Sequence, residues 1–350
     1  MLYIKSIISK PPFIYLFAIA VSFVVSALFT PVMRFIAIKF QILDHPHTDI
    51  KTHQTPTPYL GGLAIWLGWI VSLSVIRFFT HFPTGTLRNL RGMLWGTIFI
   101  IIVGLIDDIL PRGLEFKKKF LLQFIAAGCL IFFDIRIHFV NPDFMAVALS
   151  AVWAVGITNS FNIIDIMDGL SSGIALIASI AFLVIALPSE QIYVNFASAA
   201  LAGACLGFLP YNLSKRFKIF MGDTGSLTIG FILAAISMGT SYTKFNNAGL
   251  LAPLLILAIP IYDTLLVSYL RVRRGQSPFL GSKDHFALRL EFMGINRPRI
   301  LTTTYFASAL LSYGAYFATK LPPTEATILL LVFLTLALII SYFLGKVEIG

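Results

Sequence analysis

Long apolar runs dominate the chain, and short polar segments separate them. Within each run the apolar positions are continuous rather than alternating, a pattern that favours helices over strands. A run of about 20 apolar residues can cross a bilayer as a helix. The pattern predicts an all-α polytopic membrane protein with about 10–11 transmembrane helices, in one domain that covers residues 1–350. The predicted spans are 13–33, 59–79, 91–107, 119–140, 144–160, 169–187, 193–211, 224–241, 249–269, 300–319 and 325–345.

The composition excludes a soluble domain. Hydrophobic residues make up 57% of the chain and charged residues only 12%. The formal net charge of +10 does not indicate nucleic-acid binding, because the basic residues collect in loops and no aromatic-basic platform accompanies them. Cys129 and Cys205 each lie inside an apolar run, which favours packing over a disulfide or a metal site.

The basic residues are distributed unevenly between the two sides of the predicted bundle. The loops that follow every odd-numbered span, together with the C-terminus, hold eighteen Lys and Arg residues, and the opposite side holds eight. The positive-inside rule places the richer side in the cytoplasm. Eleven of the sixteen Asp and Glu residues fall on that same side. Because the rule does not sort acidic residues, we expect an acidic functional site at the cytoplasmic face.

One polar stretch interrupts the apolar pattern. Asn159, Asn162, Asp165 and Asp168 recur at every third residue, and no Lys or Arg stands near them. A three-residue step would fan these side chains around a continuous helix. We therefore predict that one helix stops near Asn162 and another begins after Gly169, so that the four side chains converge. An ionised Asp in apolar surroundings needs a partner or a metal. A polar loop with helix caps is the alternative interpretation.

Two further acidic motifs lie at the same predicted face. Asp107 and Asp108 end one span, and three lysines that include Lys119 open the next. Adjacent carboxylates at a membrane boundary repel each other unless they share a cation or a proton, and paired hard oxygens suit Mg²⁺. Asp223 stands between glycines at the start of a span, where a helix N-terminus favours anions. A solvated helix end and a plain helix cap are the alternatives for these two motifs.

Two loops add basic residues on that side. The first contains Lys51 and His53, which are candidate phosphate contacts, and a solvated loop is the alternative. The long loop 271–299 contains His285, a candidate phosphate ligand, and Arg289; a basic contact with anionic lipid is the alternative. Carboxylates for a divalent cation and basic groups for phosphate thus converge on one face. Such a set suits phosphoryl transfer to a lipid-borne acceptor, since positioning and charge neutralisation supply most of that catalysis.

The motifs together resemble those of the polyprenyl-phosphate N-acetylhexosamine-1-phosphate transferases, of the glycosyltransferase family 4 type. This superfamily also contains phospho-N-acetylmuramoyl-pentapeptide transferase. The resemblance runs from about Asp44 to Arg289, in matching order and spacing. It rests on Asp107-Asp108, Asn159-x-x-Asn162-x-x-Asp165-x-x-Asp168-Gly169, Gly222-Asp223-x-Gly225-Ser226 and Pro260-Ile-x-Asp263-Thr.

The resemblance implies a multi-pass enzyme of the bacterial inner membrane with its active site on the cytoplasmic face. Its expected reaction transfers an N-acetylhexosamine-1-phosphate from a UDP-sugar to undecaprenyl phosphate and releases UMP. GlcNAc-1-phosphate is the leading candidate for the transferred group. The reaction would initiate a cell-envelope polysaccharide such as lipopolysaccharide or O-antigen. The expected cofactor is Mg²⁺, with Mn²⁺ as the alternative. The expected partners are the two substrates and the lipid bilayer, with no nucleic acid, and a homodimer is left open.

By matching position, the resemblance also implies roles for individual residues. The catalytic residues would be Asp107, Asp108, Asp165, Lys119 and His285. The substrate-binding residues would be Asn159, Asn162, Asp168, Lys51, Asp263 and Arg289. The metal ligands would be Asp223 and Asp108.

The chain departs from the family pattern in two places. The loop that often reads His-x-His-His-Arg-Leu in the family reads His285-Phe-Ala287-Leu288-Arg289-Leu290 here. The two missing histidines predict altered recognition of the sugar or diphosphate, and they argue against the muramoyl-pentapeptide donor. The usual Asp-Gly-x-Asp-Gly has Ile166 in place of its first glycine, which puts the local turn in question.

Three other functions are kept as alternatives. Phospho-N-acetylmuramoyl-pentapeptide transfer in peptidoglycan synthesis is the alternative within the superfamily. A cation-coupled secondary transporter is the alternative from another class, and it would require acids near the bilayer midplane and repeated halves. The acids lie at span ends and the chain has no internal repeat, which disfavours a transporter. A degenerate homologue that only binds lipid phosphate is the third alternative.

Overall fold

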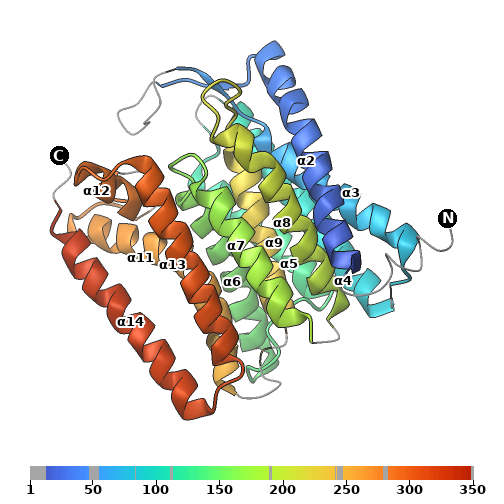
Figure 1. The fold of residues 1–350 in the computed structure, drawn as a ribbon, viewed down its shortest axis with the longest axis vertical. Coiled ribbons are helices and arrows are strands. Elements are labelled where there is room, and N and C mark those ends of the chain that lie inside the picture. The colour runs from blue at the N-terminus through green and yellow to red at the C-terminus, as the bar shows by residue number, and fades with distance from the viewer. Residues whose placement is uncertain are drawn as a thin grey trace.

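Helices account for nearly all of the described structure (Figure 1). The computed structural model describes residues 13–46, 55–82, 84–110, 113–188, 191–240, 242, 247–278 and 283–347. The helices are α2 (Phe13–Lys39), α3 (Gly61–Phe79), α4 (Thr84–Ile109), α5 (Phe116–Phe132), α6 (Asp143–Ile163), α7 (Leu170–Ala186), α8 (Ile192–Asn212), α9 (Gly222–Gly239), η1 (Asn247–Leu251), α10 (Ala252–Ile256), α11 (Ala258–Arg273), α12 (Phe286–Phe292), α13 (Arg297–Ala318) and α14 (Pro323–Gly345). In these ranges, one small antiparallel sheet pairs β1 (Leu43–Asp44) with β2 (Thr57–Pro58).

Each predicted apolar run falls on helical structure, which confirms the all-α polytopic fold. Among the described residues, length and composition identify six helices that can cross a membrane: Phe13–Lys39, Gly61–Phe79, Gly85–Ile109, Asp143–Ile163, Ile192–Asn212 and Pro323–Gly345. A seventh crossing arises if the bent pair Gly249–Ile256 and Ala258–Arg273 is one span. The other predicted spans correspond to α5, α7, α9 and α13, which are shorter or less apolar than this criterion requires.

The span predicted at 119–140 ends early. α5 stops at Phe132, and Asp134 takes a left-handed conformation with φ of 66°. Such a φ is uncommon for a residue with a side chain, and it cannot continue a right-handed helix. Residues 133–142 therefore form a connection at the end of the bundle opposite to the acidic motifs.

The span predicted at 249–269 is broken rather than straight. After η1 and α10 the chain bends by 68° before it continues as α11. Pro260 has no N–H, and in a continuous helix its ring would clash with the carbonyl of Ile256, the residue at which α10 ends. The bend carries the far half of α11 to the cavity described below.

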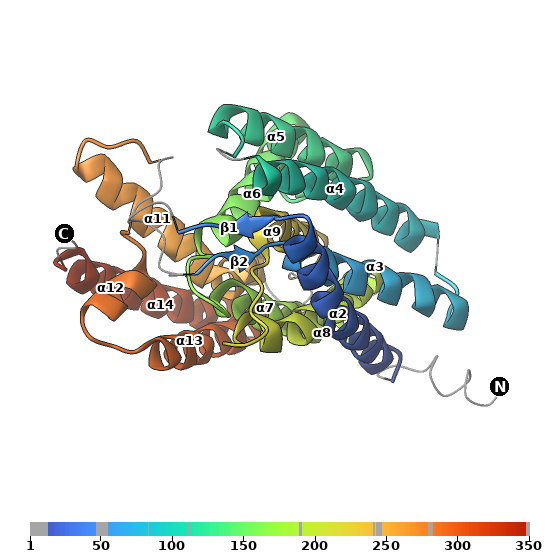
Figure 2. The ribbon, with the colours of Figure 1, turned by 90° about the horizontal axis from the view of Figure 1, so that it is seen from above.

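α9 lies at the centre of the bundle (Figure 2). It packs against α3, α4, α6, α7 and α8, and every residue from Thr224 to Ser237 is buried. The N-terminus of this central helix carries Gly222 and Asp223. The packing of five surrounding helices thus positions one of the acidic motifs.

Backbone hydrogen bonds join the start of α3 to the loop that precedes α9. The N–H of Phe220 donates to Pro58 O at 2.9 Å, and the N–H of Gly62 donates to Met221 O at 2.9 Å. A Cβ at Gly62 would overlap the backbone of Gly225 on α9, so only glycine permits this close approach. The loop before Asp223 is therefore held by β2 and the start of α3.

Candidate active site

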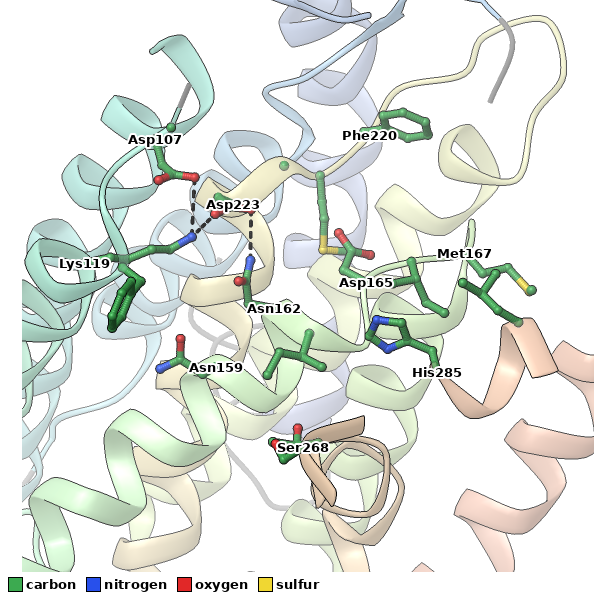
Figure 3. Close-up of a pocket in the computed structure, with 18 of the residues that line it drawn as sticks. Asp107, Lys119, Asn159, Asn162, Asp165, Met167, Phe220, Asp223, Ser268 and His285 are labelled. Carbon is green, nitrogen blue, oxygen red and sulfur yellow. Dashed lines mark hydrogen bonds and ion pairs between the residues drawn. The ribbon is translucent and has the colours of Figure 1, made fainter. Parts of the chain in front are cut away.

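A cavity of about 1160 Å³ lies at the end of the bundle where the acidic motifs meet (Figure 3). Its walls come from the α4–α5 loop, the turn between α6 and α7, the loop before α9, and α11 with the residues around α12. Eight predicted site residues line it: Asp107, Lys119, Asn159, Asn162, Asp165, Asp168, Asp223 and His285. Motifs that are far apart in the sequence therefore converge on one cavity.

Lys119 links the two acidic motifs at the cavity wall, as Figure 3 shows. Its ammonium group pairs with Asp223 and lies 3.4 Å from Asp107 Oδ2. Asp107 Oδ1 also accepts a hydrogen bond from the N–H of Leu114 at 2.7 Å. The amide of Asn162 donates to Asp223 Oδ1 at 2.9 Å. One cation thus balances two carboxylates at a partly buried place, where charge pairs are stronger than in water.

Asp108 contacts the N-terminus of α9 and does not line the cavity. Its Oδ1 accepts from the N–H of Asp223 at 2.8 Å, and its Oδ2 accepts from the N–H of Thr224 at 3.0 Å. The first N–H groups of a helix lack partners within the helix, and the helix dipole favours an anion there. Gly222 makes room for the contact, because a Cβ there would lie 2.5 Å from Asp108 Oδ2. Asp108 therefore positions the backbone of Asp223, and its direct catalytic or metal role stays a prediction.

The chain turns between α6 and α7, as the spacing of its polar residues predicts. α6 ends at Ile163 and α7 begins at Leu170. Gly169 takes a φ of 80°, and its N–H donates to Asn212 Oδ1 at 2.6 Å. Ile166 does not take a left-handed conformation, so the turn does not require glycine at that position.

Two polar residues beside this turn are held by their neighbours. Asp168 Oδ2 lies 2.6 Å from Lys218 Nζ. The side chain of Asn159 pairs with that of Gln123, and its amide also donates to Val155 O at 2.7 Å. Because both residues line the cavity, these contacts set the direction in which each would meet a ligand.

Asp165 has a carboxyl that is unsupported by neighbours. Burial raises its pKa well above the usual range, and the negative charges of Asp223, Asp168 and Asp108 raise it further. No hydrogen bond or ion pair reaches this carboxyl from the part of the chain that the structure describes. An unpaired acid with a shifted pKa in a cavity is a candidate for ligand binding or proton exchange.

We expect Asp165→Asn to stabilise the ligand-free protein, and the gain to grow with pH. At low pH the carboxyl is protonated in the folded and the unfolded states, so the substitution changes little. As pH rises, the unfolded chain ionises at its usual pKa while the folded protein retains the proton, and the wild-type protein loses stability until pH passes the raised pKa. Melting curves at about pH 5 and about pH 8 test this. A stability difference that does not grow between them would contradict it.

His285 is oriented by a buried carboxylate. Its Nδ1 lies 2.7 Å from Asp263 Oδ2, and Asp263 Oδ1 accepts from the N–H of Phe286 at 2.8 Å. Asp263 is 0% exposed and does not line the cavity. The structure thus does not support direct substrate contact by Asp263. It places this residue behind His285, with Nε2 as the ring nitrogen left for the cavity.

Arg289 is buried away from the cavity. Its guanidinium donates to Asp284 and to the carbonyl oxygens of Leu344, at 2.8 Å, and Val347. Leu344 lies in the last turn of α14 and Val347 follows the helix, at an end where the helix dipole favours a cation. Arg289 therefore anchors α14, and the structure does not support its predicted contact with substrate. The predicted contact Lys51 lies outside the described residues.

The sequence motifs omit several residues of the cavity wall. These are Asp44, Tyr59, Asn212, Lys218, Phe220 and Arg271. Tyr59 is hydrogen-bonded to Asp44, and burial, together with this carboxylate, raises the pKa of the Tyr59 hydroxyl. The loop charges indicate the correct end of the bundle for Asp44 and Lys218, but no spacing in the sequence separates them from other loop residues.

The donor groups suit a divalent cation that binds together with a phosphate. Among the described residues, no group of three or more His, Cys, Asp or Glu could hold a metal ion. Mg²⁺ commonly uses one or two carboxylates and completes its shell with water and substrate phosphate. Asp223 and Asp107 lie on either side of the Lys119 ammonium, so positive charge already occupies the space between them. Asp223 would be the ligand of such a cation.

A family profile and several known proteins are similar to this chain. The profile described as Glycosyl transferase family 4 matches residues 90–241, which contain seven of the eight predicted residues in the cavity wall. A probable undecaprenyl-phosphate N-acetylglucosaminyl 1-phosphate transferase from Bacillus subtilis is 31% identical over 335 residues, 92% of this chain and 89% of that protein. The chain belongs to glycosyl transferase family 4.

Two further similarities extend over much of the chain. The decaprenyl-phosphate N-acetylglucosaminephosphotransferase of Mycolicibacterium smegmatis is 30% identical over 348 residues, 88% of this chain and 83% of that protein. A phospho-N-acetylmuramoyl-pentapeptide-transferase from Staphylococcus epidermidis is 32% identical over 251 residues, 65% of this chain and 75% of that protein. The predicted family is thus confirmed, and this member of glycosyl transferase family 4 is a multi-pass membrane transferase.

Proposed function

We propose that this protein transfers an N-acetylhexosamine-1-phosphate from a UDP-sugar to undecaprenyl phosphate and releases UMP. GlcNAc-1-phosphate is the leading candidate for the transferred group. The observation that carries the proposal is the Lys119 bridge between Asp107 and Asp223, in a cavity at the ends of membrane-crossing helices. A water-soluble sugar nucleotide and a lipid-borne phosphate can meet at such a place. The loop charges support the cytoplasmic face of the inner membrane. The product would initiate a cell-envelope polysaccharide.

The names of similar proteins support the acceptor and the sugar. The proteins from B. subtilis and M. smegmatis are named for transfer of N-acetylglucosamine phosphate to undecaprenyl and decaprenyl phosphate, and each similarity covers most of this chain. The similarity to the muramoyl-pentapeptide transferase spans 65% of the chain. Leu288 also lines the cavity where the family pattern often has histidine. These observations favour an N-acetylhexosamine donor over the peptide-bearing one.

The side chains would act by positioning and charge neutralisation. An oxygen of the lipid phosphate attacks the β-phosphorus of the donor, and the bond to the oxygen that leaves with UMP breaks. Lys119 would offset charge on the transferring phosphoryl group, and Asp107 would orient the acceptor phosphate. Asn162 and Asp165 would hold the nucleotide side, and His285 would direct Nε2 at a phosphate oxygen.

Mg²⁺ is the proposed cofactor, with Mn²⁺ as the alternative, and Asp223 is its proposed ligand. When bound, the cation supplies Lewis-acid stabilisation of phosphate charge. Asn162 would fix the rotation of the Asp223 carboxylate toward it, and Asp108 would fix the backbone of Asp223.

Direct attack by the lipid phosphate and a two-step route through an aspartyl-phosphosugar intermediate are both open. The direct route requires the acceptor in every turnover. The two-step route predicts a burst of UMP from enzyme and donor without acceptor lipid. Single-turnover assays with the lipid omitted distinguish the two routes.

Turnover assays with purified protein test the proposal. The protein is incubated with undecaprenyl phosphate, Mg²⁺ and a panel of UDP-sugars, and UMP and the lipid product are measured. We expect UMP and a diphospholipid product with a UDP-N-acetylhexosamine, and no lipid product when the acceptor is left out. Turnover with the muramoyl-pentapeptide donor alone would favour the peptidoglycan alternative. No turnover with any UDP-N-acetylhexosamine would contradict the leading proposal.

A further inference from the structure

A second cavity lies at the other end of the helix bundle. It has a volume of about 650 Å³ and is lined by the 133–142 connection, the end of α9, the start of α8, and residues of η1 and α10. It shares no lining residue with the first cavity. The proposed transferase reaction makes no use of this cavity.

Tyr193 lines this second cavity and has a hydroxyl without a hydrogen-bond partner among the described residues. The residue is 5% exposed, and no described residue hydrogen-bonds its hydroxyl. The hydroxyl packs against Gly239, where any Cβ would overlap it. A hydroxyl that lines a cavity without a protein partner can donate a hydrogen bond to a ligand and accept one from it.

The charged groups of the cavity are paired with one another. Arg136 Nε lies 3.0 Å from Asp134 Oδ1, and Arg136 also pairs with Asp143. His138 Nε2 lies 4.0 Å from the same oxygen of Asp134. An anion would have to displace two carboxylates from Arg136, and a cation would meet the guanidinium. The cavity therefore favours a neutral ligand.

Aromatic rings and hydrogen-bonding groups lie together in the cavity wall. Trp153 Nε1 donates to Ser237 Oγ at 2.8 Å, and the Tyr242 hydroxyl donates to Ser237 O at 2.9 Å. These polar atoms already have hydrogen-bond partners. The ring faces, the Tyr193 hydroxyl and the Asn89 amide are then the groups that can contact a ligand. An interfacial aromatic belt would face lipid, but Tyr193 and Tyr242 are 5% and 6% exposed. Rings beside a few polar groups are typical of a small-molecule site, and they match the C–H face and hydroxyl edge of a sugar ring.

Part of the lining of this cavity is apolar and exposed. Leu149, Leu251 and Leu254 line it, and they are 43%, 44% and 43% exposed. In a protein that crosses a membrane, such leucines at the end of a span contact acyl chains. A ligand that carries acyl chains can thus place its head in the cavity and its chains on these leucines.

We propose that the second cavity binds a lipid with a neutral, multiply hydroxylated head group, the chemistry of a sugar ring. The head group would hydrogen-bond with the Tyr193 hydroxyl and the Asn89 amide and lie against the ring of Trp153. The acyl chains would lie along the three exposed leucines. The site does not depend on the transferase function proposed above.

Lipid retention tests this site in the full-length protein. The protein is placed in phosphatidylcholine nanodiscs that contain monoglucosyl diacylglycerol or phosphatidylserine, and the retained lipid is identified by native mass spectrometry. We expect preferential retention of the glucosyl lipid. Tyr193→Phe removes one hydroxyl and keeps the ring, so retention should fall roughly twofold to tenfold, as for loss of one neutral hydrogen bond. Tyr313→Phe makes the same change at a ring that is 62% exposed on α13, and should change nothing.

Three outcomes would overturn the proposal. Equal or greater retention of phosphatidylserine would exclude a neutral head group. Displacement by soluble maltose at concentrations equal to those of the glucosyl lipid would show a site for free saccharide rather than for lipid. Unchanged retention by folded Tyr193→Phe would remove the hydroxyl from the site. UMP release by Tyr193→Phe should equal that of the wild-type protein, which separates this test from that of the transferase.

Discussion

Asp223→Asn is expected to lower UMP release by roughly 10³-fold while the protein stays folded. Asp223 is the point at which Lys119, Asn162 and the proposed Mg²⁺ meet. An amide has no charge to pair with the ammonium and is a weaker ligand for a hard cation. Steady-state UMP release as a function of Mg²⁺ concentration measures the loss, and melting curves report whether the variant is folded.

A matched variant controls for the change from carboxylate to amide. Asp143→Asn alters a side chain that is 75% exposed at the opposite end of the bundle, and its turnover should stay within about twofold of wild type. Binding of Mn²⁺, followed by its paramagnetic resonance spectrum, gives a readout for Asp223→Asn that does not depend on turnover. Near-normal turnover or undiminished Mn²⁺ binding would remove Asp223 from the metal role.

Asp263→Asn is expected to lower kcat by roughly 10²- to 10⁴-fold, with a smaller effect on KM. The buried carboxylate accepts from the N–H of Phe286 and faces Nδ1 of His285. It therefore favours the tautomer with the proton on Nδ1 and leaves Nε2 for the phosphates. Asparagine can present its NH₂ to Nδ1 instead, which would favour the opposite tautomer. Steady-state kinetics with the proposed substrates measure the effect.

A double substitution distinguishes positioning from a general structural role. His285→Gln removes the imidazole through which Asp263 would act. In that background, Asp263→Asn should cost little further activity, because residues that act as a unit are not additive. Fully additive losses in kcat would show that Asp263 acts independently of His285.

The sequence was informative where chemistry is local. The step of three residues from Asn159 to Asp168 is incompatible with one continuous helical face, and the helix indeed ends at Ile163 and resumes at Leu170. The loop charges predicted one functional end of the bundle, and the cavity lies where those loops meet. Pro260 breaks the span in which it stands, but the apolar pattern alone indicated one straight helix there.

The side chains whose contacts the sequence did not predict are those that face another helix. Asp108 and Asp107 are adjacent in the sequence, yet Asp107 reaches the cavity and Asp108 contacts the start of α9. Arg289 stands in the motif loop, but the carbonyl groups at the end of α14 bind it. In each case a partner more than 50 residues away decides the direction of the side chain.

Apolar length and loop charge in the sequence are enough to establish the helices, the all-α membrane class and the end of the bundle that carries the acids. They suffice because lipid forces backbone groups to bond within each span, and because basic loops sort to one side. The Lys119 bridge, the support of His285 by Asp263 and the second cavity around Tyr193 arise only in the tertiary structure. A hydrogen bond near 3 Å depends on how distant helices pack, and helical periodicity carries no information about that distance.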